Sequence, residues 1–342
     1  MNEVSVIIPH AGGREILTEC LAGLASSVGV SLETIIVDNG SDDAEEVARA
    51  FSGVQILRFP CMLGFSVACN KGVEAATAPL VFLLNNDAVV EPDTIRRLVT
   101  AMNSDPAIAA VQPKILSYAD PQKFDYSSAA GGELDLYGYP FARGRLFDHI
   151  ESDEGQYDDD RDCFWGAGAA LMVRRELYLS AGGLAEIFYA HMEEIDLQWR
   201  LHLMGYRVRA IGNCSVRHRG AVTIKSGSFL KLYLNHRNSL ALLVRNYSYG
   251  SLAKFLPIRL ILDGVAAIYA VFCGNFIHSA AILRANCWFF VRFFYLIRLR
   301  GAVQRLRVVP DSLIRKKLYN GSVVWDFFYR KRQTWRQLHW KN

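Results

Sequence analysis

The chain has 342 residues, of which 51% are hydrophobic and 21% are charged. This composition excludes a disordered protein, and the length gives room for one large domain or two smaller ones with a sizeable core. The formal net charge of +4 hides an asymmetry: residues 1–219 hold 18 Lys and Arg against 31 Asp and Glu, whereas residues 220–342 hold 20 against 3. The two parts therefore meet different environments.

The charge of each part indicates a class of partner. An acidic front suits a site for a divalent metal, and a basic back rich in aromatics and leucine suits nucleic acid or anionic lipid. Seven cysteines, an odd number without a CxxC pair, indicate reduced thiols in a cytosolic compartment. No secretory signal precedes the first apolar run, so we expect the front part to stay where it is made.

Short apolar runs alternate with helical patterns over the first hundred residues, which predicts a parallel sheet covered on both faces. Ligands of such sheets bind beyond the carboxyl ends of the strands. The expected strands are Val4–Ile8, Thr34–Val37, Val54–Arg58 and Leu80–Leu84, and the expected helices are Arg14–Ser26, Asp43–Phe51, Ser66–Ala76 and Thr94–Asn103.

The rhythm breaks over residues 117–163, which are rich in glycine and carry the acidic run Asp153–Asp162. We expect a long, partly ordered loop there, with room for a hairpin, that serves as a lid or lies solvated on the surface. Regular structure is expected to return in Phe164–Val173, a helix from Arg174, the helix Glu193–Met204, and the short strands Tyr206–Ile211 and Cys214–Arg217.

The character of the chain changes after residue 226. Leu230–Asn246 is expected to be helical, and the 20 residues Gly264–Leu283 contain no charged side chain, a length that can span a bilayer or lie in its surface. Aromatics mixed with arginines over Trp288–Leu299 are typical of a membrane interface on the cytoplasmic side. We therefore expect residues 226–342 to form a basic, membrane-associated helical tail.

Polar residues follow two of the expected strands. Asp38 ends the second strand, where its carboxylate can contact a nucleotide or close a local Asx-type turn. Asn85, Asn86 and Asp87 follow the fourth strand and offer hard oxygen ligands, which suit Mg²⁺ or Mn²⁺ held by a carboxylate and substrate phosphates. These three residues can instead cap the turn before the next helix.

Three carboxylates, of Glu193, Glu194 and Asp196, open one helix. A helix dipole favours acidic residues in the first turn, but three within four residues exceed what capping needs. Glu193 and Glu194 point about 100° apart, so one of them can face a cleft and deprotonate an acceptor hydroxyl. His218 is either a structural histidine or a metal ligand that needs a partner such as Asp87.

Six motifs in a fixed order resemble glycosyltransferase family 2, most of all its rhamnosyltransferase-type branch. The resemblance runs from about residue 3 to residue 225. It implies an α/β nucleotide-sugar-binding fold of the GT-A type, an inverting mechanism, and residues 1–225 as the catalytic domain. The motifs are Val4–Pro9, Ile35–Asp42, Leu63–Gly72, Leu83–Asp87, Gly166–Arg175, and a last block from Gly182 through Glu193–Leu197, Arg200 and Gly205-Tyr206 to His218.

The resemblance also implies roles for individual residues. Glu194 would be the catalytic base, with Glu193 as the second candidate. Asp87 and His218 would hold a divalent metal, Mg²⁺ or Mn²⁺, at the diphosphate of the donor. The donor would be lined by Pro9, His10, Asp38, Gly64, Asn70, Asn85 and Asn86.

This chain departs from the family pattern in four places. His10 and the next residue replace a Thr and an aromatic, Met62 replaces an Asn, Ala185 replaces an Asp, and Glu194 stands where an Asp is usual. The longer Glu194 side chain moves its carboxylate by roughly one C–C bond, and a misplacement on the order of 1 Å can cost much of the rate. A chain that binds a nucleotide-sugar without transferring it is therefore one alternative.

We expect an inverting, metal-dependent glycosyltransferase that moves one sugar to a saccharide or lipid-linked acceptor in cell-surface polysaccharide synthesis, on the cytoplasmic face of an anionic membrane. A nucleic-acid-binding protein is the alternative that the basic tail offers. Its apolar runs would be exposed in a soluble binder, so no nucleic-acid partner is expected. A processive synthase would need a QxxRW motif and a dinucleotide dehydrogenase a GxGxxG after the first strand, and neither motif occurs.

Overall fold

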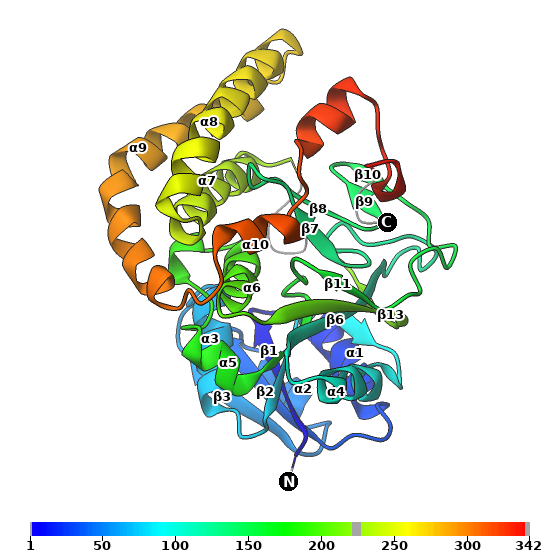
Figure 1. The fold of residues 1–342 in the computed structure, drawn as a ribbon. Helices are drawn as coiled ribbons and strands as arrows, with labels where there is room; N and C mark the ends of the chain where they lie inside the picture. Colours follow the sequence, from blue (N-terminus) through cyan, green and yellow to red (C-terminus); the bar gives the residue numbers. More distant parts are fainter. Residues whose placement is uncertain (1, 221–226, 339–342) are drawn as a thin grey trace.

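The structure is a computed structural model that describes residues 2–220 and 227–338. Among these residues, nine strands form a large sheet in the lower half of Figure 1, with helices on both faces. The strands are β1 (Val4–His10), β2 (Leu32–Asn39), β3 (Val54–Phe59), β4 (Leu80–Leu84), β5 (Ala88–Val90), β6 (Ile108–Ser117), β11 (Arg161–Cys163), β12 (Ala170–Arg174) and β13 (Arg207–His218). The helices are α1 (Arg14–Ala25), α2 (Ala44–Ala48), α3 (Phe65–Ala75), α4 (Thr94–Ser104), α5 (Arg175–Ser180) and α6 (Glu193–Leu203).

The large sheet is mixed but mostly parallel, in the order β11-β13-β6-β12-β4-β1-β2-β3, with β5 beside β13. Strands β3, β2, β1 and β4 run parallel, as the alternation of strands and helices predicts. Strand β12 runs antiparallel to its neighbours β4 and β6. This reversal brings the loop before β12 to the edge where β1, β2 and β4 end.

Alternate residues of the central strands face opposite sides of the sheet. In β1, Val6 and Ile8 pack in the same cluster as α1, whereas Ile7 packs with α3 on the other face. All five residues of β4 are buried, as expected for a strand covered on both sides. The apolar runs of the sequence thus build a sheet whose carboxyl edge alone is open for a site.

The segment 117–163 is not the partly ordered loop that we expected, although it does contain the hairpin for which we expected room, as β7 and β8. It holds a second, antiparallel sheet with strands in the order β10-β9-β8-β7. Strands of two or three residues are too short to show alternation, and their apolar partners, such as Trp335, come from the far end of the chain. The strands are β7 (Gly132–Leu134), β8 (Pro140–Ala142), β9 (Arg145–Leu146) and β10 (His149–Ile150).

The two short strands expected at Tyr206–Ile211 and Cys214–Arg217 form one long strand, β13. Its pairing with β6 shifts in register between Ile211 and Ser215, which explains why the alternation is interrupted there. The irregular stretch interrupts the sequence pattern without ending the strand.

The C-terminal helices are α7 (Phe229–Asn246), α8 (Tyr249–Phe272), α9 (Phe276–Arg305) and α10 (Asp311–Lys317), followed by helical turns at Trp325–Tyr329 and Trp335–Leu338. The uncharged stretch Gly264–Leu283 is not one continuous span, because the turn Cys273–Asn275 divides it. It forms instead the tip of the α8–α9 hairpin, which projects from the molecule in Figure 1. By length and composition alone, α8 and α9 are each long and apolar enough to cross a membrane.

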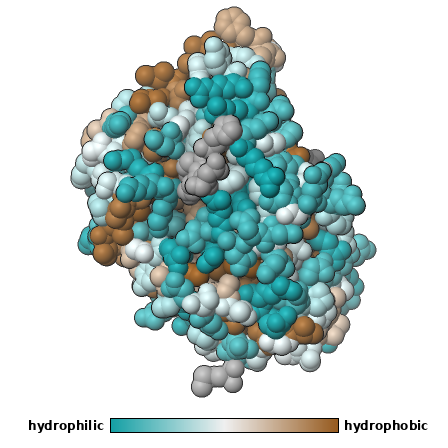
Figure 2. Space-filling view, turned by 45° about the vertical axis from the view of Figure 1, so that its right-hand side comes forward, coloured by the Kyte–Doolittle hydropathy of each residue, from teal (hydrophilic) through white to brown (hydrophobic). Residues whose placement is uncertain are grey.

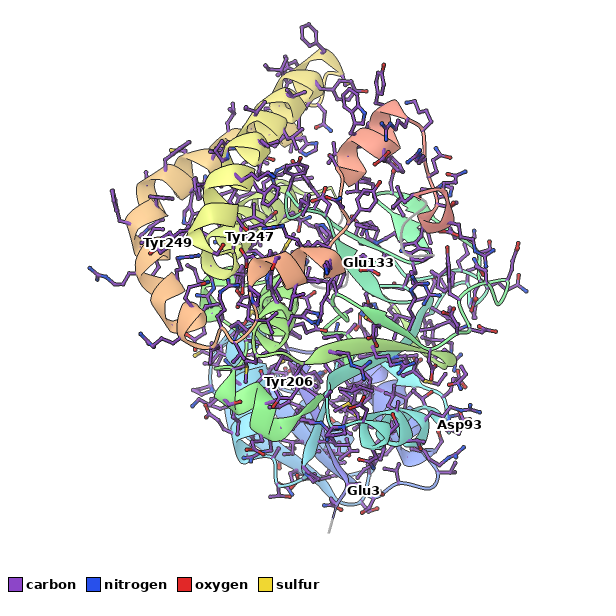
Figure 3. The ribbon with its side chains drawn as sticks, viewed as in Figure 1. Glu3, Asp93, Glu133, Tyr206, Tyr247 and Tyr249 are labelled. Atoms are coloured by element: carbon purple, nitrogen blue, oxygen red, sulfur yellow. The ribbon has the colours of Figure 1, made fainter. Side chains whose placement is uncertain are left out.

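Helix α7 completes the core of the catalytic part. Residues Leu240–Val244 are fully buried, and the ring of Tyr247 packs edge-on against Trp199 of α6 at 4.9 Å. The Tyr247 hydroxyl donates to the backbone oxygen of Leu136 at 2.9 Å, and Figure 3 shows this residue among the C-terminal helices. The domain boundary that we expect at 225/226 falls outside the described residues, but the helices beyond it share a core with the sheet.

Candidate active site

Strands β1 and β2 end side by side in polar residues. His10 and Asp38 are opposite each other in register, and Pro9 precedes them in β1. The buried Asp38 carboxylate accepts hydrogen bonds from the N–H and the hydroxyl of Ser41, both at 2.8 Å. Its other oxygen lies 3.5 Å from Nε of Arg58. Asp38 therefore closes a local turn, one of the two roles left open by the sequence.

Asn86 and His10 connect the ends of β4 and β1. The Asn86 amide donates to Nδ1 of His10 at 2.9 Å, and Nε2 of His10 lies 2.7 Å from Oδ1 of Asp43. His10 is buried, so these two contacts fix both its orientation and its tautomer. The unusual His10 thus links two strand ends.

His218, the last residue of β13, lies between two carboxylates. Its Nε2 is 3.2 Å from Oδ1 of Asp87 and its Nδ1 is 3.1 Å from Oδ1 of Asp125, and the Asn85 amide also lies 3.2 Å from Nε2. Burial opposes protonation of His218, but the hydrogen bonds and charges of both carboxylates outweigh it and raise its pKa to about 10. The two carboxylates therefore favour the protonated ring as long as no cation is bound.

The Asp87–His218 pair fits a divalent cation that takes most of its ligands from elsewhere. Asp87 offers a carboxylate oxygen, and His218 offers Nε2 once its proton is displaced. In residues 2–220 and 227–338 no group of three or more His, Cys, Asp or Glu is arranged to hold a metal. Phosphate oxygens and water would have to complete the coordination, which is the usual arrangement for Mg²⁺.

Glu193 and Glu194 open α6 and point in different directions. Glu193 is 5% exposed and faces the core, where its charge adds to burial in raising the pKa of the Cys69 thiol. Glu194 is half-buried and lies by the loop before β12. A Cβ atom added to Gly168 in that loop would be 3.9 Å from the Cβ of Glu194. In the described structure, one carboxylate oxygen of each is buried without a hydrogen-bond partner.

Burial raises the pKa of both carboxyl groups. For Glu193 the neighbouring charge of Glu194 adds to burial, and the pKa lies well above its usual range. For Glu194 burial outweighs the hydrogen bonds from backbone N–H groups at the start of α6, and the pKa rises to about 7. A carboxyl group with this pKa changes protonation near neutral pH, as general-base catalysis requires.

The loop before α6 has an unusual backbone. Tyr189, His191 and Met192 have positive φ angles of 65°, 68° and 76°, and such conformations cost on the order of 1 kcal/mol or more each. The side-chain amide of Asn238 in α7 donates to three backbone oxygens between Phe188 and His191, at 2.7–2.9 Å. Helix α7 therefore fixes the segment that leads into the acidic pair.

Two predicted donor residues belong to α3 and its start. Gly64 caps the helix with φ at 83°, and a Cβ there would meet no atom within 4 Å. The Asn70 amide donates to the oxygen of Leu184 at 2.9 Å and accepts from the N–H of Leu184 and the hydroxyl of Tyr178 at 2.8 and 2.6 Å. Asn70 thus connects α3 to the turn at Leu184. Its predicted role in donor binding is not favoured, because these three contacts already occupy its amide group.

Sequence reasoning missed Asp43, Asp125 and Asn238. Asp43 could have been found, since it follows the Asp38 motif directly and the sequence places it by the end of β1. Asp125 lies in the segment taken for a loop and reaches His218 over 93 residues. Asn238 reaches the loop before α6 over about 50 residues. No local pattern marks either of these two.

The strand order, the helices on both faces and the polar carboxyl edge together define a GT-A-like fold. Two solved structures share it: GalNAc-T7 with UDP, GalNAc and Mn²⁺ (TM-score 0.59, 14% identity, 75% of this chain and 50% of that one) and the mannosyltransferase PcManGT from Pyrobaculum calidifontis with GDP-Man and Mn²⁺ (TM-score 0.52, 14% identity, 90% and 86%). The chain thus spans half the length of GalNAc-T7, and the likeness concerns the fold.

The profile of glycosyl transferase family 2 matches residues 5–177, half of the chain, and the chain belongs to this family. It is also similar to the N-acetylglucosaminyl-diphospho-decaprenol L-rhamnosyltransferase of Mycobacterium tuberculosis, with 25% identity over 272 residues that cover 74% of this chain and 86% of the relative. The prediction from the motifs is confirmed: the chain is a glycosyltransferase of the rhamnosyltransferase-like kind.

Proposed function

We propose that this glycosyltransferase moves one sugar, with inversion, from a nucleotide-sugar to a saccharide carried on a lipid diphosphate, in cell-surface polysaccharide synthesis at the cytoplasmic face of the membrane. The observation that carries the proposal is Glu194: a half-buried carboxyl group with a pKa of about 7, next to the loop before β12. That loop is joined to the Asp87 turn, because the backbone N–H of Asn85 donates to the oxygen of Ala169 at 3.0 Å.

Glu194 acts as the general base in this proposal. Its carboxylate takes the proton of the acceptor hydroxyl while the hydroxyl oxygen forms a bond to the anomeric carbon of the donor. The bond from that carbon to the diphosphate breaks, and its electron pair leaves with the nucleoside diphosphate. One displacement of this kind inverts the anomeric configuration. Glu193 faces the core, which is why we assign the base to its neighbour.

Asp87 and His218 would hold a divalent cation, Mg²⁺ or Mn²⁺, at the donor diphosphate. When bound, such a cation neutralises charge on the departing group. Asp125 orients the His218 ring from the opposite side to Asp87, at 3.1 Å. The nucleotide-sugar would lie against the strand ends and the start of α3, which carry Pro9, His10, Asp38, Asn85, Asn86 and Gly64.

The name of the mycobacterial relative motivates a diphosphate-linked lipid as the acceptor class. The α8–α9 hairpin offers the apolar surface that a membrane-bound acceptor requires, since Phe272, Phe276 and Phe294 are 86%, 66% and 84% exposed. Brown and tan surface gathers at the top of the molecule in Figure 2, where the hairpin tip lies. We therefore assign catalysis to residues 1–225 completed by α7, and membrane association to the α8–α9 hairpin within residues 226–342.

Nucleotide release by the detergent-solubilised protein tests the proposal. The assay supplies UDP-, GDP- and dTDP-sugars with Mg²⁺ or Mn²⁺ and extracted lipid acceptors. We expect one donor to be consumed, and we expect chelation of the metal or Asp87→Ala to abolish turnover. Asp93→Ala removes a carboxylate that pairs with Arg97 on the surface and should keep the wild-type rate. Donors that bind without being consumed would favour the alternative, a binding protein that has lost its base.

A further inference from the structure

Two cationic side chains lie on the ring of Tyr126. The guanidinium carbon of Arg145 is 4.7 Å from the ring centroid, and the ammonium of Lys231 is 4.8 Å from it. The preceding residue, Asp125, contacts His218 at 3.1 Å. Asp125 thus joins the two sites, because it contacts His218 and its charge also acts on both cations.

In the described part of the chain, neither cation has a carboxylate within 4 Å, although Asp125 acts on both at longer range. Arg145 is 6% exposed, and its guanidinium donates to the backbone oxygens of Ser127 and Phe147, each at 3.2 Å. Burial and the charge of Arg145 together lower the pKa of Lys231. Two partly desolvated cations whose nearest counter-charge, Asp125, is shared with His218 destabilise a fold, and a bound anion would offset that cost.

His191 connects this cationic pair to the proposed base. It lies two residues before Glu193, and its Nε2 is buried without a hydrogen-bond partner in the described structure. Burial and the charge of Lys231 lower its pKa to about 4, so the ring is neutral at pH 7. The pair comes from β9 and α7 rather than from the strand ends that face the nucleotide. This origin favours the acceptor over the donor as the source of the anion.

An aromatic surface lies on the side of α7 that faces α9, about 160–200° around the helix from Lys231, which lies on the side of Asn238. On α7 the rings of Phe229 and Tyr233 are stacked at 6.4 Å, and Arg284 of α9 lies over both, at 5.9 and 5.3 Å. Helix α9 begins at the exposed Phe276, about two turns before Arg284. The exposed Leu230 lies between Lys231 and this surface, so an apolar chain bound at Lys231 would pass around the start of α7 to reach it.

We propose that Arg145 and Lys231 bind the phosphate groups that join the acceptor saccharide to its lipid. The proposal rests on the function proposed above, since it takes the acceptor to be lipid-linked. The phosphate oxygens accept hydrogen bonds from both cations, the lipid passes around the start of α7 toward the α8–α9 hairpin, and the saccharide extends toward Glu194. The subsite selects acceptors that carry a phosphate at this point.

Binding of farnesyl diphosphate in detergent micelles tests the subsite without turnover, with farnesol as the uncharged probe. We expect tighter binding of the diphosphate than of farnesol. Lys231→Gln should weaken the diphosphate at least about tenfold, as expected for one lost charge-assisted hydrogen bond, and leave farnesol unchanged. Lys231→Arg should keep most of the affinity. Lys71→Gln, at an exposed lysine paired with Glu74, is the matched control. Equal binding of the two probes, or an unaffected Lys231→Gln, would overturn the proposal.

The binding of UDP, GDP and dTDP distinguishes acceptor phosphates from donor phosphates. Nucleotide affinity should be the same in the wild type and in Lys231→Gln. A parallel loss of nucleotide affinity would place the cations in the donor site and overturn the proposal. The wild type could also bind farnesyl diphosphate tightly and yet consume no donor. That outcome would support the phosphate subsite, and it would contradict only the proposed function.

Discussion

At the scale of single residues, Glu194 shows how burial brings a carboxyl group to neutral pH. Only the carboxylate can accept a proton, so kcat should be low in acid and rise with pH through a midpoint near the pKa of about 7. Glu194→Gln should lower kcat by about 10²-fold or more and remove this rise. Steady-state rates of both proteins between about pH 5 and pH 9 check the prediction. An acid limb that persists in the variant would assign the base to another group.

Glu193 should act on stability more than on the chemical step. Burial and the charge of Glu194 raise the pKa of Glu193 in the folded protein, so folding favours its neutral form. The protein is therefore most stable below the pKa that Glu193 has in the unfolded chain, and it loses stability as the pH rises above that value. Glu193→Gln keeps the neutral shape without that loss. The variant should unfold at a higher temperature than the wild type at pH 8 and at a similar temperature at pH 4. Thermal melts at both pH values measure this, and an equal difference at the two would contradict it.

At the scale of elements, α7 holds the loop before α6 through Asn238. Without that amide, three backbone oxygens lose a donor, and only Arg237, which donates to the oxygens of Ile187 and Phe188, still ties the loop to α7. The positive φ angles between Tyr189 and Met192 are then free to relax. We expect Asn238→Ala to lower kcat by about tenfold or more, since Glu194 would lose its position, while nucleotide affinity stays unchanged. The matched control is Asn286→Ala, whose amide donates within its own helix. Equal effects of the two variants on kcat would remove the positioning role.

The elements also show how far local sequence patterns reach. The strands β1 to β4 lie within two residues of their expected bounds, because buried runs and helical faces are properties of neighbouring residues. Asp87 and His218, expected as partners, do meet at 3.2 Å. The second sheet, Asp125 and Asn238 escaped prediction because each depends on residues far along the chain. The α8–α9 hairpin was not predicted for another reason. The turn at Cys273–Asn275 contains no charged residue, so the hydropathy pattern continues through it without a break.

At the scale of the whole molecule, the charge of the tail is partly internal. Arg245 pairs with Asp196 of α6 at 3.0 Å, Arg259 pairs with Asp263 at 3.1 Å, and Arg300 donates to the oxygen of Val244 at 2.8 Å. These arginines are buried and join helices to each other or to the sheet. The formal charge of the tail therefore overstates its basic surface, and the proposal of membrane association rests on the exposed aromatic tip instead.

The hairpin tip should carry membrane binding. A charged side chain at the depth of a bilayer costs about 2–3 kcal/mol, so Phe272→Glu with Phe276→Glu should lower the affinity for vesicles with anionic lipid by about 10²-fold or more. Val28→Glu adds a charge at an exposed apolar residue after α1 and serves as the matched control. Flotation of the three proteins with the vesicles measures the difference.

Because the tip is remote from the strand ends, the double variant should still release nucleotide from the donor in detergent but fail with acceptor in vesicles. Unchanged flotation of the double variant would show that the tip stays outside the bilayer. It would also remove the membrane route that we propose for the acceptor lipid.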